Sequence, residues 1–297
     1  MAVLIGLVAF GCNLSPEPVE TPGQMNGAMQ IWAALGTEML TDIDIPLMEG
    51  TGMVAAGVGL RGDPGVAQPG NIDITVPGTV KQVIIYWEGQ NATSGGDGNI
   101  MVDGNPVPGM LIGGPTEFFG GAWSSTYRAD ITSLGVVNSG ANSIPIDGMG
   151  FTRCTEANDC RNNGAGIIVI YDDGGAPVDI GIKDGNDLAF YQFAPTLDTT
   201  EPVTFMFDAA SAMRTGKLIL MAGSVQPDRP NVVDVWFDTG ASHRYVDVFI
   251  NGDGPDFDTV ERSVDVPAGA TWMKVQCLSE KDGSSTFNGI PASLAWL

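Results

Sequence analysis

Residues 80–87 read VKQVIIYW and residues 166–171 read GIIVIY, and these two apolar stretches decide the fold class. Each is short, rich in Val, Ile and aromatic residues, and bounded by turn-forming residues, which is typical of a β-strand. Further runs of this kind occur at 178–182, 203–207, 218–222, 232–237, 245–250 and 273–278. The sequence therefore predicts an all-β body.

The composition agrees with that prediction. The 297 residues include 41 Gly and 19 Pro, while 43% of the chain is hydrophobic. Helical bundles and coiled coils exclude Gly and Pro from their interiors. Disordered chains have low hydrophobicity. A turn-rich protein with a substantial core remains.

Two pairs of segments resemble each other in the same order along the chain. Residues 83–89 (VIIYWEG) align with 217–223 (KLILMAG), and residues 163–171 (NGAGIIVIY) align with 288–296 (NGIPASLAW). This internal similarity favours a duplication, and it agrees with a length of about 150 residues per domain. We expect two tandem antiparallel β-sandwich domains of the jelly-roll type. Their bounds would be 47–194 and 195–297.

The N-terminus is typical of export. Residues 2–10 read AVLIGLVAF and precede Gly11-Cys12. Nine apolar residues are too few to cross a bilayer as a helix and suit a secretory signal. A small residue before Cys12 is similar to a bacterial lipobox, which implies cleavage there and a lipid on Cys12. Residues 1–11 would be the signal peptide and 12–46 a tether, with a buried N-terminal strand as the alternative.

The remaining cysteines fit an oxidising compartment. Cys154 and Cys160 have five residues between them, in a polar stretch between apolar runs, so we expect a disulfide that closes a small loop. The spacing is not that of a zinc site. Cys277, within an apolar run, is expected to be a buried free thiol.

The charge excludes several partners. With 13 Lys and Arg against 35 Asp and Glu, the net charge of −22 argues against nucleic acid and against direct binding to an anionic membrane. The membrane would be reached only through the lipid on Cys12. His243 is the single His, which excludes sites with several imidazoles. We expect His243 in an exposed loop, with Ser242 pointing to the opposite face.

Glu88 is the one weak catalytic candidate. It follows Trp87 at the end of an apolar strand, and the second copy has Ala222 at that place. A general acid or base beside an aromatic residue fits this pattern. A solvated acid at a strand end is the alternative. Double jelly-rolls with carboxylate sites at the domain interface exist, and that analogy rests on architecture alone.

Two loops suggest binding. Oxygen ligands for Ca²⁺ are concentrated at Asn251, Asp253, Asp256 and Asp258, without the pattern of an EF-hand. Solvated turns are the alternative there. In the Gly-rich segment 113–123, the aromatic residues Phe118, Phe119 and Trp123 would stack on sugar rings, unless that loop is tucked under the sandwich.

Four motifs together resemble a known family. They are IIYWEG at 84–89, YRADIT at 127–132, NNGAGIIVIYDD at 162–173 and IKDG at 182–185. Over roughly residues 50–190 the chain resembles the DUF3344-type β-rich domain of bacterial and archaeal surface proteins. The resemblance implies a secreted or surface-displayed module and carries no catalytic residues.

The predicted function is an exported module of the bacterial cell envelope. It would serve adhesion, glycan binding or envelope architecture, with an extracellular glycan or protein as partner and with Ca²⁺ as a stabilising ion. The alternative is a secreted, carboxylate-dependent hydrolase that acts on glycans or glycopeptides at a double jelly-roll interface.

Overall fold

The fold is all-β, as predicted. The computed structural model describes residues 3–7, 39–61, 68–118, 121–152, 161–190, 197–225, 231–250, 252–279 and 293–296. These residues form strands, turns and one short 3₁₀ turn, Thr132–Leu134, with no α-helix among them. In the same part of the chain, no helix is long and apolar enough to cross a membrane.

The strands form four sheets, numbered here I to IV. Sheet I contains, in order, β4 (Gly70–Val76), β10 (Gly140–Asp147), β6 (Asn99–Val102) and β7 (Asn105–Pro108). Sheet II contains β3 (Gly52–Gly59), β11 (Gly164–Asp172), β5 (Thr79–Asn91), β9 (Trp123–Asp130) and β8 (Met110–Glu117). Sheet III contains β13 (Asp187–Phe190), β20 (Ser293–Trp296), β15 (Arg214–Gly223), β1 (Val3–Leu7), β12 (Asp179–Asp184) and β2 (Thr41–Asp42), and β18 (Phe257–Val266) also pairs with β15. Sheet IV contains β14 (Val203–Met206), β19 (Trp272–Leu278), β16 (Val232–Phe237) and β17 (Ser242–Val246).

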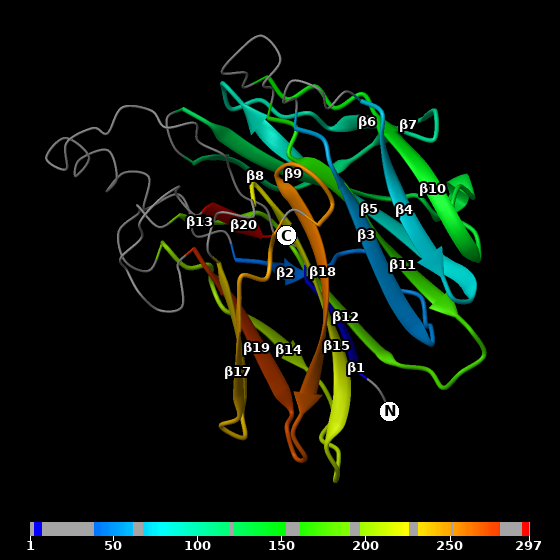
Figure 1. Cartoon of the computed structure of the whole chain (residues 1–297), viewed down its shortest axis with the longest axis vertical. Coiled ribbons are helices and arrows are strands. Elements are labelled where there is room, and N and C mark those ends of the chain that lie inside the picture. The colour runs from blue at the N-terminus through cyan, green and yellow to red at the C-terminus, as the bar shows by residue number, and fades with distance from the viewer. Residues whose placement is uncertain are drawn as a thin grey trace, which may run out of the picture.

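Three hydrophobic cores separate the four sheets. One lies between sheets I and II and another between sheets III and IV. The third, which we call the junction core, lies between sheets II and III and joins the two sandwiches. In Figure 1, β4, β7 and β10 of sheet I lie at the upper right, while β14, β17 and β19 of sheet IV lie at the lower left.

The central strands are apolar on both faces because both faces are buried. On β5, Ile85 and Trp87 face the first sandwich's core, whereas Ile84 and Tyr86 face the junction core. Side chains on β15 alternate in the same way: Ile219 faces the junction core, and the residues on either side of it face the core of the second sandwich. An uninterrupted apolar run is what a doubly buried strand requires.

Asp103 and Gly104 form a tight turn between β6 and β7. Both residues have positive φ, 48° for Asp103 and 73° for Gly104, and Val102 pairs with Asn105 across them. Two residues with positive φ between paired strands are the tight hairpin that suits the twist of a sheet.

The expected seam at residue 194 does not separate the sheets. β12 and β13 precede it in sequence, yet they belong to sheet III together with β15 and β18. The duplication stays a prediction. In both halves the two similar segments form neighbouring antiparallel strands. Their registers differ, because Glu88 pairs with Gly164, whereas Ala222, which aligns with Glu88, pairs with Trp296.

The expected signal sequence supplies a strand in this structure. The backbone of β1 pairs in parallel with β12 on one side and with β15 on the other (Figure 1). This arrangement corresponds to the alternative of an N-terminal strand. Cleavage before Cys12 would remove β1 from sheet III.

Candidate functional site

Glu88 lies in the junction between the two sandwiches. Because side chains alternate along a strand, Glu88 faces the same side of sheet II as Ile84 and Tyr86, toward sheet III. Its side chain is 0% exposed. The expectation of a solvated acid at a strand end is therefore wrong. The strand continues past Glu88 to Asn91, and every residue from Gln82 to Asn91 is buried.

Both carboxyl oxygens of Glu88 have hydrogen-bond partners. The Ser124 hydroxyl lies 2.8 Å from Oε1, and Asn163 Nδ2 donates to Oε2 at 2.6 Å. Ser124 lies on β9, and Asn163 directly precedes β11, so the two strands that flank β5 each supply one partner. Sheet register thus fixes the carboxyl group.

The hydrogen bonds continue into sheet III. Ser124 Oγ is 3.3 Å from Asn186 Oδ1, and Asn163 Nδ2 donates to Ser224 Oγ at 3.2 Å. Asn186 follows β12, and Ser224 follows β15. We call Glu88, Ser124, Asn163, Asn186 and Ser224 the junction network. It connects the two sandwiches through polar contacts inside a largely apolar interface.

Glu88 is protonated at neutral pH. Burial raises its pKa from 4.5 to about 8, against the hydrogen bonds from Ser124 and Asn163, and the charge of Asp256 raises it further. At pH 7 the protonated form is therefore favoured.

An ion pair also crosses the junction. Arg61, which follows β3, contacts Asp256 at 2.7 Å, and the two side chains are 2% and 0% exposed. Asp256 belongs to the segment before β18, and the backbone of that segment bonds to β3 through Gly59 N and Asp253 O at 2.8 Å. At Gly59 an added Cβ would lie 2.4 Å from Pro255 O, so the close approach requires glycine.

The calcium prediction is not supported by this geometry. Within the described residues, no group of three or more His, Cys, Asp or Glu side chains could hold a metal ion. Asp256 is paired with Arg61, and Asp258 accepts a hydrogen bond from Ile250 N at 2.6 Å. The aspartates are drawn to separate partners because this segment docks against β3. Asn251 lies outside the described residues.

A second polar group lies nearby in the same interface. Arg128 donates to Asp184 Oδ2 at 2.6 Å and also pairs with Asp44, while the Tyr86 hydroxyl donates to Asp184 at 3.2 Å. Burial, the largest cause, raises the pKa of Asp184, and the contacts with Arg128 oppose it. Arg128 is thus a buried ionic partner on β9.

The predicted sugar platform does not form as a set of exposed rings. Phe118 is 0% exposed and packs edge-on against Phe190 in the junction core, with 6.1 Å between the ring centres. The prediction that Phe118 stacks on sugar rings is therefore wrong. The burial of Phe118 fits the alternative of a segment tucked under the sandwich. Trp123 is half-buried at the start of β9. Phe119 lies outside the described residues.

His243 lies in strand β17 and not in a loop. Its ring is half-buried, and the ring centres of Phe237 and Tyr245 lie 6.2 Å and 6.3 Å from its own. The exposed Ser242 alternates with it along the strand, as predicted. The two side chains are therefore not placed to exchange a proton.

The cysteine predictions have different outcomes. Cys277 is buried and free, as expected, and burial raises the pKa of its thiol. Cys12, Cys154 and Cys160 lie outside the described residues, so the lipid anchor and the disulfide stay predictions.

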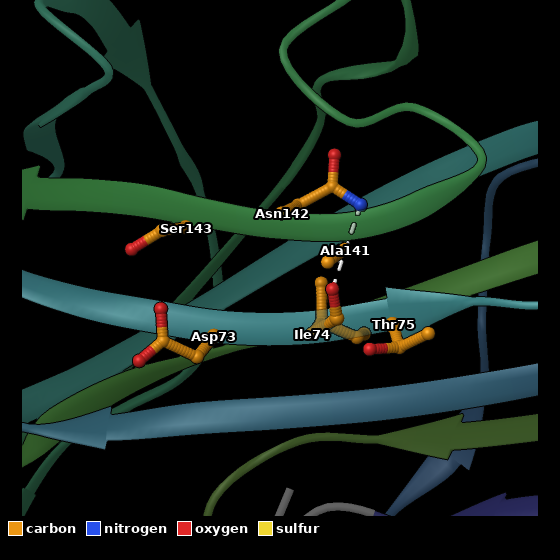
Figure 2. A pocket seen from close by; sticks show the side chains of 6 residues that line it. All are labelled: Asp73, Ile74, Thr75, Ala141, Asn142 and Ser143. Carbon is orange, nitrogen blue, oxygen red and sulfur yellow. Dashed lines mark hydrogen bonds between the residues drawn. The ribbon is translucent and has the colours of Figure 1, made fainter.

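A shallow hollow of about 440 Å³ lies over β4 and β10 on the outer side of sheet I. Figure 2 shows its side chains along these two adjacent strands, with Asn142 Nδ2 donating to Ile74 O at 3.5 Å. Asp73 is the charged residue among those that line it. The hollow is separated from Glu88 by the first sandwich's core, so it is no entrance to the junction network.

Most of the junction network was missed by sequence reasoning, which selected Glu88 alone. Asn163 directly precedes one doubly buried strand, and Ser224 directly follows another. Polar residues at the ends of uninterrupted apolar runs were the signal that could have found them.

Comparisons with known proteins give distant likenesses only. No family model matches the chain, and no curated protein matches it. The chain is similar to PNGase F, a glycosylasparaginase from Flavobacterium meningosepticum, with 13% identity and a TM-score of 0.25 over 82% of this chain and 94% of that one. The chain is also similar to a peptide-N(4)-(N-acetyl-β-D-glucosaminyl) asparagine amidase, with 11% identity and a TM-score of 0.25 over 82% of this chain and 94% of that one. For the VP2 subviral particle of infectious bursal disease virus, the identity is 10% and the TM-score is 0.20 over 93% of this chain and 78% of that one. Likeness at this level carries no argument about chemistry.

Proposed function

We propose that the chain is an exported binding or structural module of the bacterial cell envelope. One observation carries the proposal: Glu88, the catalytic candidate, is 0% exposed, and its two partners Ser124 and Asn163 in turn contact Asn186 and Ser224 of the other sandwich. A group that a substrate cannot touch does not perform acid–base chemistry on it. The junction network then acts as a joint, and the outer sheet faces are available to partners.

The test compares binding with turnover. Purified protein and its Glu88→Gln variant are incubated with polysaccharides and glycopeptides, and bound protein is measured beside released sugar and ammonia. We expect both proteins to bind alike and to release neither product. Release by the wild type that is lost in Glu88→Gln would overturn the proposal.

A secreted hydrolase is the second candidate, and the ionisation of Glu88 favours it. A carboxyl group with a pKa of about 8 is protonated at pH 7, as a general acid must be. Asp256 is a second carboxylate close enough to raise that pKa. The Asn186 amide nitrogen is buried without a hydrogen-bond partner in the described part of the chain, and a ligand group could accept from it. The release assay above decides between the two functions.

Export belongs to the proposal through the N-terminal motif. The apolar run before Cys12 fits a lipoprotein signal, but the same residues supply β1. Mass spectrometry of the chain from membranes distinguishes the two. We expect the first residue to be a lipid-modified Cys12, with β12 and β15 lacking β1 in the mature protein. An intact Met1 would contradict export by this route.

A further inference from the structure

Sheet IV presents an outer face that combines aromatic and ionic side chains. Along β16 and β19, buried residues such as Val235 and Met273 face the core of the second sandwich, and the residues between them face outward. We give the name Trp face to six members of the outward set, Met206, Asp234, Trp236, Arg244, Trp272 and Lys274. In Figure 1 its strands β14, β17 and β19 lie on the side of the molecule away from sheets I and II.

Strand register places Trp236 and Trp272 at diagonal positions on the same face of sheet IV. Trp236 on β16 pairs with Lys274 on β19, and Trp272 lies two residues before Lys274 on the same strand. Diagonal neighbours of this kind are about 7 Å apart, which lets large side chains form one surface. Met206, 72% exposed, pairs with Trp272 and extends that surface across β14.

The ionic groups are placed beside the rings. The Lys274 ammonium lies over the Trp272 ring, 5.5 Å from its centre. Arg244 on β17 lies directly opposite Asp234 on β16, and its Nε donates to Asp234 Oδ1 at 2.7 Å. A hollow of about 310 Å³ lies between this ion pair and Trp236, which is at the small end of ligand-sized pockets.

The charge of this face favours an anionic ligand. The chain as a whole carries −22, so an anion is repelled by most of its surface. On the Trp face Arg244 is paired with Asp234, so the net positive charge among these side chains is that of the Lys274 ammonium. Sugar rings have apolar faces that stack on indole, and their carboxylates pair with ammonium and guanidinium groups.

We propose that the Trp face binds a glycan chain that carries carboxylate groups, with sugar rings on Trp236 and Trp272 and a carboxylate beside Lys274. The proposal rests on the proposed function of an envelope module and names its partner class and its surface. It does not use the junction network.

The experiment is calorimetric titration with two probes, hexagalacturonate and the neutral cellohexaose. We expect hexagalacturonate to bind more tightly, and Trp236→Ala or Trp272→Ala to weaken its binding by roughly tenfold or more. Trp236→Phe keeps an aromatic ring and should retain most of the affinity. Lys274→Met should lower the affinity and reduce its dependence on salt.

Tyr171→Ala is the matched control, since Tyr171 is also a half-buried aromatic residue but lies in the first sandwich. Its binding should stay at the wild-type value, and circular dichroism should show that every variant is folded. The proposal is overturned if Tyr171→Ala weakens binding as much as Trp236→Ala does, if cellohexaose binds better, or if neither probe binds. None of these results depends on Glu88, so a hydrolase that needs Glu88 would contradict the proposed function while leaving the Trp face intact.

Discussion

The junction network and the Trp face each bring together side chains from neighbouring strands, but they differ in access to water. Glu88 in the junction is 0% exposed, whereas Met206 on the Trp face is 72% exposed. Burial makes polar contacts in the first region strong and costly to break, and exposure leaves the second region free to exchange partners. The difference separates what holds this molecule together from what it can present.

The largest effect is expected from breaking the buried ion pair across the junction. Asp256→Asn removes the carboxylate 2.7 Å from the Arg61 guanidinium, which is 2% exposed, and this should cost about 3–5 kcal/mol of unfolding free energy. Urea unfolding at pH 7 measures it. Lys81→Met is the control, because the Lys81–Asp172 pair is about one-third exposed and should lose less than about 1 kcal/mol. Equal losses would remove the distinction between the two regions.

Two methionines compare the regions directly. Met221→Ala empties part of the junction core, where Met221 is 0% exposed, and should cost about 2–5 kcal/mol. Met206→Ala on the Trp face should change stability by less than about 0.5 kcal/mol. Thermal unfolding of both variants checks this pair. A large loss for Met206→Ala would mean that the Trp face is covered in solution.

The pH dependence of stability reports the state of Glu88. Its folded pKa of about 8 lies above its ordinary value of 4.5, so the folded protein holds the proton more tightly than the unfolded chain does. Stability from this group is therefore complete below pH 4.5 and declines by up to about 1.4 kcal/mol per pH unit until about pH 8. Glu88→Gln, which cannot ionise, should remove this decline.

Urea unfolding of both proteins at a series of pH values measures that slope. An unchanged slope in Glu88→Gln would show that Glu88 is not buried as described. The glutamine side chain of this variant can still accept from Asn163 and contact Ser124, so the variant should remain folded.

The fold class was predictable because doubly buried strands leave long apolar runs in the sequence. The run at 80–87 became β5, but the strand extends to Asn91 because neighbouring strands supply partners for its polar end. The run at 245–250 was placed less well. The observed β17 is Ser242–Val246, and the backbone of Val248 and Phe249 donates instead to the Asn231 side chain. A long-range side-chain acceptor leaves no periodic pattern in a sequence.

The sites were less predictable, because they depend on which segments meet. Asp256 looked like a calcium ligand from its acidic neighbours, yet its partner is Arg61, 195 residues away. Glu88 was found since it interrupts an apolar strand, while its exposure could not be judged without sheet III. The Trp face was missed because its alternation is clear only once β14, β16, β17 and β19 are known to be paired.

The smallest effect is expected from the exposed ion pair of the Trp face. Arg244 and Asp234 are 40% and 23% exposed, so Asp234→Asn should cost less than about 1 kcal/mol and less still in high salt. Unfolding in low and high salt measures this. The same substitution removes the single anion among the six Trp-face side chains, so the affinity for an acidic glycan should rise while stability hardly changes. A stability loss as large as that of Asp256→Asn would place this pair with the junction and take away its role as a surface for partners.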